Sequence, residues 1–475
     1  MRSPSPRWTV AALAAALLAL SGCASLQQPA AAPPTLQLPA AWNGAGSAAS
    51  ATEAAALAAW WQRFDEPALP PLVELALAGS TDIAAAQARL RQARAQRDLT
   101  AAGRALSVSG SGSAQAGRSD GSATTERYAA SIDARWEADL WGGTAAGLRA
   151  AETTAEASAA TLAGTRITVA AEVALNLLQL RGTQARLANA RASLASQQQT
   201  LQIVQWRADA GLVTQLDVEQ AKTAVEQTRA QIPALDASAS QAMNALAVLT
   251  GRAPGALADT LQPRTPALAP TTPPDLALAL PAEVLRQRPD LRAAELRLQA
   301  AAARVDQADA ERLPSLSLGG SIGLNALSLA GLSSAPAAAS LLASVSVPLL
   351  DGGRLRAQVR QQEAARDEAE VAYRATLLAA LQEVEDSLVA LRGTREQLAA
   401  QRAAATSALN AAQIAEQRYR SGLVDFQNVL QTQRTLLSAQ DSVAATATML
   451  ATQHVRLYKA LGGGWSPDTA LITPP

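Results

Sequence analysis

One histidine and one cysteine stand far apart in this chain of 475 residues, at His454 and Cys23. A metal centre needs several histidine, cysteine or carboxylate ligands close together, and a nucleophile needs a base beside it. Neither residue has such a neighbour in the sequence, so we expect His454 to be a packed or solvated helix residue. The carboxylates Glu383, Glu385 and Asp386 follow helical spacing with arginines nearby, which is typical of a solvated helix face. The sequence therefore predicts no enzymatic activity, no metal and no cofactor.

Residues 1–22 have the layout of a secretory signal peptide. Two arginines precede an apolar run at residues 10–20, which is too short to span a bilayer. The next residues, "LSGC", end at Cys23 and resemble a bacterial lipobox. That resemblance implies cleavage before Cys23 and a covalent lipid on its sulfur; the alternative is a chance cysteine at the cleavage site. Ala24, which follows in place of aspartate, implies sorting to the outer membrane.

The composition favours closely packed helices over a core of large side chains. Hydrophobic residues make up 49% of the chain, but aromatic residues make up only 3%, and much of the remainder is alanine. Alanine is the best helix former, because it loses no side-chain entropy. The formal net charge is zero, which gives no electrostatic footprint for nucleic acid.

The chain carries the same landmarks twice. The segment at 82–112 resembles the segment at 290–320, and "LWGG" at 140–143 parallels "LDGG" at 350–353. A "GLV" motif also occurs at 211–213 and again at 422–424. The three offsets are 208, 210 and 211 residues, in one order along the chain. A period this long does not indicate a solenoid, so we interpret it as a tandem structural repeat of two halves.

These landmarks and the proline-rich stretches predict the domain boundaries. Residues 23–50 are rich in Ala, Pro, Ser and Gly, which is typical of a flexible leader after a lipid anchor. The first repeat is expected at 51–250 and the second at 282–461. A proline-rich connection lies between them at 251–281, and a tail occupies 462–475.

Two very long helices are predicted, because proline is missing from 142–232 and from 349–466. A helix from 144 to 209 would be about 99 Å long, and one from 354 to 420 is similar. Shorter helices are expected in pairs, at 82–102 with 212–250 and at 290–312 with 423–461. Stacked end to end, each pair roughly matches one long helix, which predicts four helical columns packed as coiled coils. An ordinary antiparallel bundle is the alternative.

Four segments alternate between polar and apolar residues: 105–116, 128–140, 316–324 and 343–347. Strands of this kind are typical of a membrane β-barrel, although a half-buried soluble sheet alternates too. Tyr128, Trp136 and Trp141 are placed where aromatic residues line a membrane interface. Four strands cannot close a barrel, and open strand edges do not occur in lipid, so the chain must form oligomers. A dimer would supply eight strands and a trimer twelve.

In the order of its motifs, the whole mature chain resembles the TolC-like outer-membrane factors, and most closely their NodT-like lipoprotein branch. The residues that carry this resemblance are "LSGC", "WWQRFDEPAL" at 60–69, "WEADLWGG" at 136–143, "RPDLRAAELRLQAA" at 288–301, "EVEDSLVAL" at 383–391 and "YRSGLVDFQNVLQTQRTLL" at 419–437.

The resemblance implies an α+β membrane protein that assembles as a homotrimer. Its twelve strands form an outer-membrane β-barrel, which continues into a long periplasmic α-helical barrel with an equatorial belt from 52–80, 251–289 and 462–475. Such a channel is passive and exports small molecules delivered by an inner-membrane pump, usually of the resistance-nodulation-division class, through a periplasmic adaptor. A type I secretion tunnel for polypeptides and a lipid-anchored periplasmic coiled-coil protein are the alternatives.

The resemblance also places the functional residues at the two "GLV" corners, which become turns at the periplasmic tips. The expected adaptor contacts are Gly211, Leu212, Val213, Thr214, Gly422, Leu423, Val424 and Asp425. Asp217 and Tyr419 match positions that close the tip in the family. The carboxylates that constrict some relatives fall six and nine residues after Gly422, where this chain has Asn428 and Gln431. This departure implies a neutral polar iris, unless Asp425 supplies a ring of charge.

Overall fold

The computed structural model describes residue 42 and residues 59–118, 124–262, 270, 285 and 288–463. The predicted signal peptide, Cys23, nearly all of the leader, most of the proline-rich connection and residues 464–475 lie outside the described residues. The described chain divides into two compact units. The sheet unit holds residues 91–157 and 294–373, and the tip unit holds residues up to 90, 158–293 and 374 onward.

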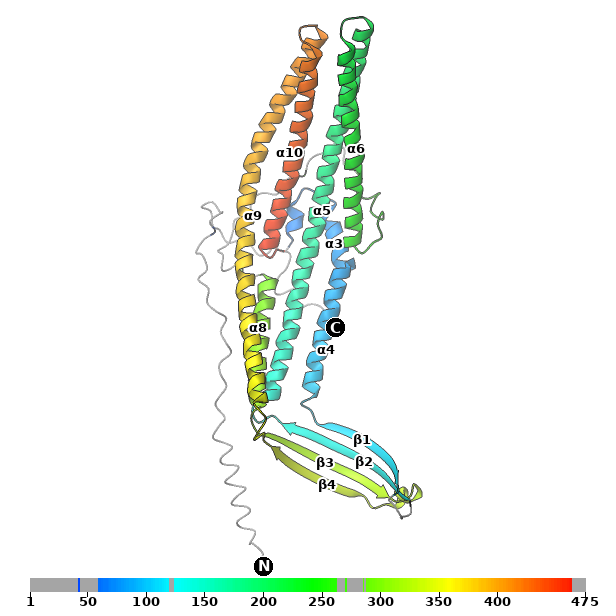
Figure 1. Cartoon of the computed structure of the whole chain (residues 1–475), viewed down its shortest axis with the longest axis vertical. Helices are drawn as coiled ribbons and strands as arrows, with labels where there is room; N and C mark the ends of the chain where they lie inside the picture. Colours follow the sequence, from blue (N-terminus) through cyan, green and yellow to red (C-terminus); the bar gives the residue numbers. More distant parts are fainter. Residues whose placement is uncertain are drawn as a thin grey trace, which may run out of the picture. The chain divides into compact units, whose positions relative to one another are not determined.

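The sheet unit contains four antiparallel strands in the order β1-β2-β3-β4, side by side in Figure 1. Their bounds are Ser107–Gly117, Thr125–Ala138, Ser315–Ala326 and Ala338–Ser346. The hairpin of the first repeat therefore pairs with the hairpin of the second through β2 and β3. Both outer edges, along β1 and β4, have no strand beside them within this sheet.

The register keeps the two faces of the sheet in phase across all four strands. On the apolar face Ile132 lies opposite Ile322, and Leu318 lies between Trp136 and Ala343. On the polar face three pairs of serine hydroxyls meet across strands at 2.8 Å: Ser111–Ser131, Ser317–Ser344 and Ser321–Ser340. This confirms the predicted alternation. The strand predicted at 343–347 begins earlier, at Ala338, because its first residues are small and give no strong alternating signal.

The described helices are η2 (Trp60–Arg63), α3 (Leu69–Gly79), α4 (Thr81–Ala102), α5 (Gly143–Asp209), α6 (Gln215–Leu249), α8 (Pro289–Ala310), α9 (Arg354–Arg420) and α10 (Phe426–Ala460), with a short 3-10 turn, η3 (Ala330–Ser334), between β3 and β4. Six of them, α4, α5, α6, α8, α9 and α10, match predicted ranges closely, whereas η2, α3 and η3 were not predicted. The long helices α5 and α9 have 67 residues each. The predicted starts at 212 and 423 are wrong by three residues, because the residues after each glycine form the turn.

None of the described helices combines the length and the hydropathy needed to cross a bilayer.

The core of the tip unit combines an aromatic cluster around Trp60 with leucine, valine and alanine side chains along the helices. Trp60 is fully buried and stacks on Tyr458 of α10, with ring centroids 5.4 Å apart. Farther along, α5 and α10 approach so closely that a Cβ on Gly182 would lie 2.1 Å from the hydroxyl of Thr448. Glycine at this point allows the close helix packing that the composition predicted, although large leucine side chains also fill the core.

The short helices meet end to end within the tip unit. Gly251, after α6, lies against the segment before α4, where its added Cβ would be 2.1 Å from the Gly79 carbonyl. In the second repeat the Arg288 guanidinium, just before α8, donates to the Ala460 carbonyl of α10 at 2.7 Å. Both junctions agree with the predicted stacking of short helices.

Candidate functional site at the helix tips

Two corners with the same backbone geometry join the helices of each repeat, α5 to α6 and α9 to α10 (Figure 1). The N–H of Gly211 donates to the Ala208 carbonyl at 2.9 Å, and the N–H of Leu212 donates to the Arg207 carbonyl at 2.8 Å. The corner at Gly422 repeats both hydrogen bonds, at 3.0 and 2.9 Å. This pair of bonds is a Schellman motif, which requires a left-handed residue after the helix. Both glycines have φ of +72°, so the sequence needs glycine there for its backbone conformation.

The next helix starts with a capping pair at each corner, but the two pairs differ chemically. At the first corner the Thr214 hydroxyl accepts from the Asp217 N–H at 3.4 Å, and the Asp217 carboxylate accepts from the Thr214 N–H at 3.0 Å. At the second corner the Asp425 carboxylate accepts from the Asn428 N–H at 3.3 Å and from its side-chain amide at 2.7 Å. The family resemblance implies gate or contact roles for these residues, and in the structure each of them makes a capping contact.

An arginine of the first repeat holds an aromatic residue of the second. The Arg207 guanidinium carbon lies 4.3 Å from the ring centroid of Tyr419, and Arg207 Nη2 donates to the Arg420 carbonyl at 3.0 Å. Tyr419 also packs on Phe426, with ring centroids 6.0 Å apart. Beneath these contacts both repeats contribute to one apolar cluster, made of Val204, Val218, Ala221, Ala224, Ala415, Tyr419, Phe426, Val429 and Leu430.

Tyr419 lies in an apolar environment next to charges of both signs. Burial raises the pKa of its hydroxyl above the ordinary value of 10.0; the Arg207 charge opposes this shift and Asp217 adds to it. The hydroxyl has no hydrogen-bond partner among the described residues. Tyr419 therefore stays neutral, and the Arg207 guanidinium lies over its ring.

Three leucines are exposed at the corners, beside polar side chains such as Gln215 and Gln427. Leu212, Leu216 and Leu423 are exposed, whereas Val213 and Val424 turn partly inward against the apolar cluster. In each "GLV" motif, glycine therefore forms the turn, valine packs against the apolar cluster and leucine is exposed to solvent.

Asn428 and Gln431 both lie on an exposed face of α10. Val429 and Leu430, between them, are buried in the apolar cluster. The two amides therefore share a solvent-facing side of the helix, although Asn428 is also held by the Asp425 cap.

Two cross-repeat contacts at the tips were missed by the sequence analysis. One is Arg207 on Tyr419, and the other is the side-chain amide of Gln427, which donates to the Gln220 side-chain carbonyl at 2.6 Å. A signal for the first was available, because Arg207 and Arg418 each stand four residues before a corner glycine. Only the first arginine lies over a ring, which the repeat alone could not reveal.

The residues considered first for chemistry lie elsewhere in the tip unit. His454 is buried in α10, 6.5 Å from the ring centroid of Tyr458. Glu383 is exposed, as predicted, but also pairs at 2.8 Å with the buried Arg288, which holds Asp290 at 2.7 Å. Across the described ranges, no group of three or more His, Cys, Asp or Glu side chains is placed to hold a metal ion.

The family profile described as outer membrane efflux protein matches residues 72–252 and 280–463 of this chain. The chain belongs to the outer membrane efflux protein family. The two matched ranges carry one tip corner each.

Relatives and solved structures of this family cover almost the whole chain. The pyoverdine export outer membrane protein OpmQ of Pseudomonas putida is 34% identical over 92% of this chain and 94% of its own length. Nodulation protein T of Rhizobium leguminosarum is 29% identical over 96% and 94%. The solved outer-membrane channel OprN is 34% identical, with a TM-score of 0.81 over 92% of this chain and all of its own. The fold is thus that of a TolC-like channel, and the protein is an outer-membrane channel of an efflux system.

Proposed function

We propose that three copies of this chain form a passive export tunnel across the outer membrane. The observation that carries this proposal is the four-stranded sheet, which has one apolar face, one polar face and two open edges. The edge strands β1 and β4 run in opposite directions, so β4 of one copy can pair antiparallel with β1 of the next. Three copies give twelve strands, enough for a barrel with an open lumen, and no edge remains in lipid.

The proposed cargo is small molecules moved by a partner's energy. Relatives of this chain are named for the export of pyoverdine and toluene, which supports a small-molecule cargo over polypeptides. The channel itself carries out no reaction. An inner-membrane pump, of the resistance-nodulation-division type by family resemblance, would supply the energy.

A periplasmic adaptor would dock on the corners. The leucines of the two "GLV" motifs are exposed there, on turns whose backbone is fixed by the Schellman bonds and the caps. A preorganised apolar surface loses little entropy when a partner covers it. Opening would require the corners to separate, which breaks the contact between Arg207 and Tyr419.

The proposed iris is neutral. Asn428 and Gln431 present amides at the exposed face of α10, and amides select ions less strongly than carboxylates do. The lipid on Cys23, which we also propose, would tether the mature chain to the outer membrane beside its barrel.

Negative-stain imaging of the detergent-extracted mature protein tests the assembly. We expect threefold rods that carry a detergent belt at one end. On gels, unheated samples should run as a compact SDS-resistant form that heat converts to a slower one. Monomers without a belt, released from membranes by Cys23→Ser, would instead indicate a lipid-anchored coiled-coil protein.

A further inference from the structure

The two most exposed leucines of the described chain lie together at one turn, between β4 and α9. Leu349 is 90% exposed and Leu350 is 97% exposed. Hydrophobic side chains exposed singly are ordinary, but an adjacent pair this exposed on a tight turn calls for a partner. The repeat indicates what that partner is.

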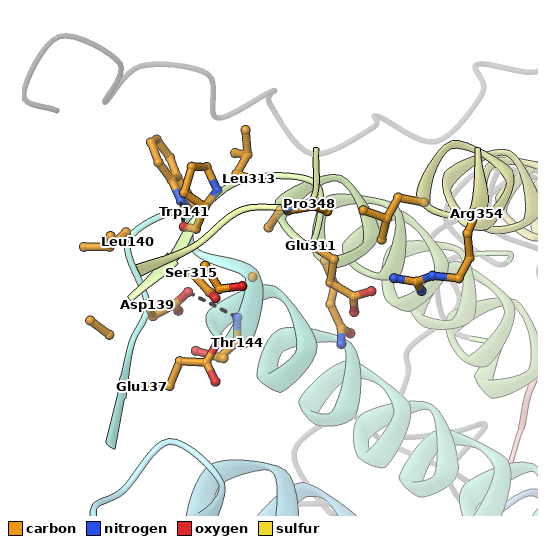
Figure 2. Close-up of a pocket in the computed structure, with 17 residues that line it drawn as sticks. Glu137, Asp139, Leu140, Trp141, Thr144, Glu311, Leu313, Ser315, Pro348 and Arg354 are labelled. Carbon is orange, nitrogen blue, oxygen red and sulfur yellow. Dashed lines mark hydrogen bonds between the residues drawn. The ribbon is translucent and has the colours of Figure 1, made fainter. Parts of the chain in front are cut away.

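In the first repeat the corresponding turn is covered in part by the same chain, which leaves Leu140, the counterpart of Leu350, only 48% exposed. The turn between β2 and α5 lies against the end of α8, where the Trp141 indole N–H donates to the Pro314 carbonyl at 2.7 Å. Figure 2 shows this junction, a cavity of about 430 Å³ with Asp139, Leu140, Trp141 and Leu313 toward one side and Glu311 and Arg354 toward the other. The Asp139 carboxylate accepts from the Thr144 N–H there, which fixes the start of α5.

The repeat offsets identify the residues of the other repeat that are equivalent to those of this junction. Along the helix–strand connection the offset is 208 residues, so Gln307 corresponds to Leu99 and Pro314 to Leu106. Along the strand–helix turn it is 210 residues, so Asp139 corresponds to Leu349 and Leu140 to Leu350. The cavity is lined in part by Gln307, Pro314, Asp139 and Leu140.

The four equivalent residues, Leu99, Leu106, Leu349 and Leu350, are all exposed leucines. Leu99 is 67% exposed and Leu106 is 61% exposed.

These four leucines cannot meet within one chain. Leu106 precedes β1 and Leu349 follows β4, at opposite edges of the sheet. Three strand spacings separate these edges, about 14 Å. The two edges nevertheless share one level, because β1 leaves the helices and β4 returns to them. The end of β4 in one copy therefore comes beside the start of β1 in a neighbouring copy.

The glycines at the starts of α5 and α9 also indicate that a neighbouring copy covers the second junction. A Cβ on Gly143, at the start of α5, would lie 2.8 Å from the Ala310 side chain of α8. Gly353, its counterpart before α9, has nothing within 4 Å of an added Cβ. The chain itself packs against the helix start at Gly143, whereas the position of Gly353 faces open space.

We propose that Leu349 and Leu350 of one copy pack on Leu99 and Leu106 of the next, an apolar seal that closes the ring at the junction of sheet and helices. The partner is a second copy of this chain, joined head to tail. This inference rests on the proposed trimer and identifies the side chains that lock it. The first repeat has Asp139 at this position and the second repeat has Leu349. The junction inside the chain is therefore polar, and the equivalent junction between copies is apolar. The helix cap moves to Asp351, which accepts from the Leu355 N–H at 2.9 Å.

Cysteine cross-linking in isolated outer membranes tests the contact. The variant Leu106→Cys/Leu350→Cys, oxidised with copper phenanthroline, should form disulfide-linked dimers and trimers. The span of about 14 Å across one sheet exceeds the reach of a disulfide, so every such bond joins two copies. The single variants control for Cys23. The pair Leu106→Cys/Leu329→Cys, with the second cysteine at the far end of the sheet, should not cross-link.

A second measurement separates the seal from the fold. Leu349→Ser/Leu350→Ser should reduce the SDS-resistant trimer by about tenfold or more, because two leucines lose their apolar partner. The matched control is Leu327→Ser/Leu329→Ser, whose leucines are also exposed but lie at the β3–β4 connection, and it should leave the trimer unchanged. A stable trimer with neither cross-link nor sensitivity to Leu349→Ser/Leu350→Ser overturns the seal and leaves the proposed function standing. A wild-type chain that is monomeric overturns both.

Discussion

The guanidinium of Arg207 lies over the ring of Tyr419, 4.3 Å from its centroid, and so joins the tip of the first repeat to the tip of the second. The same side chain donates to the Arg420 carbonyl. Because the contact is partly exposed, its cation–π component is about 0.5–1 kcal/mol in each copy. In the proposed trimer, three such contacts would favour the resting tip and would be broken when an adaptor docks.

Removal of this arginine should loosen the closed tip. We expect Arg207→Ala to raise the open fraction of the channel about two- to fivefold for each independent contact, measured as conductance in planar bilayers. Arg418→Ala is the matched control, because Arg418 stands at the same distance from the other corner glycine and is exposed. Equal conductance of the two variants would refute a role for the Arg207 contact.

The corner glycines should be intolerant of alanine for a backbone reason alone. Gly422 has φ of +72° and open space around an added Cβ, so Gly422→Ala should cost about 1–2 kcal/mol of local stability without any steric clash. Faster hydrogen exchange in the last turn of α9 would report this loss. Gly393→Ala, inside the same helix and equally unobstructed, should be neutral or stabilising. If Gly393→Ala raised exchange at the tip as much, the backbone explanation would fail.

The close approach of α5 and α10 predicts a strong steric effect in the tip unit. A Cβ on Gly182 would lie 2.1 Å from the Thr448 hydroxyl and 2.8 Å from its methyl group. Gly182→Ala should therefore destabilise the protein by about 1–3 kcal/mol through overpacking. The unfolding temperature of Gly182→Ala/Thr448→Ala should recover part of this loss, since the hydroxyl and methyl group are gone and only the Thr448 Cβ, at 2.9 Å, still lies close. Additive losses in the double variant would show that the two helices do not meet at this point.

Acid should weaken the junction between α8 and α10. Burial tends to raise the pKa of Asp290, but hydrogen bonds and charge from Arg288 outweigh it, so the pKa lies below the ordinary 3.8. A lowered folded-state pKa means that Asp290 stabilises the fold above pH 3.8 and that this contribution is lost as the pH falls through the folded value. Asp290→Asn should therefore lower the unfolding temperature at pH 7. In this variant the unfolding temperature should also decrease less steeply below pH 4 than in the wild type. An equally steep decrease in both proteins would contradict the stabilising role of the Asp290 carboxylate.

The neutral iris predicts a channel with little preference for cations. Asn428→Asp adds one carboxylate per copy on the exposed face of α10, and in a trimer these form a ring. We expect the variant to become cation-selective and to be blocked by millimolar divalent cations, whereas the wild type is not. Reversal potentials under a salt gradient measure the change. Strong cation selectivity in the wild type would place a charged ring elsewhere, with Asp425 as the first candidate.

Much of the fold could be predicted from the sequence, because its strongest signals are local. Long ranges without proline gave α5 and α9 to within a residue at each end, and the alternation gave all four strands. The start of β4 was missed because alanine and serine there carry no apolar period. The cap at each corner was missed as well, since Thr214 and Asp425 mark a helix start only once the glycine turn is placed.

The contacts between repeats were beyond the sequence. Arg207 and Tyr419 are 212 residues apart, and the equivalent arginine at 418 makes no such contact with a ring. Nor does helical spacing tell that Glu383 reaches the buried Arg288. Long-range partners depend on how two helices are rotated against each other, which a periodic pattern constrains only to one face.

The acidic residue of the helix cap occupies a different position at each of the two corners. At the first corner the carboxylate sits at Asp217 in the first turn of α6, and at the second it sits three residues earlier in the repeat, at Asp425. Each position lets one carboxylate meet the backbone N–H groups at a helix start, so the turn tolerates either arrangement. After the duplication, the two corners could therefore diverge in the side chains they expose while each kept a stable turn. A chain with two corners can vary them independently. If one identical corner occurred six times around the ring, a change in it would alter all six positions at once.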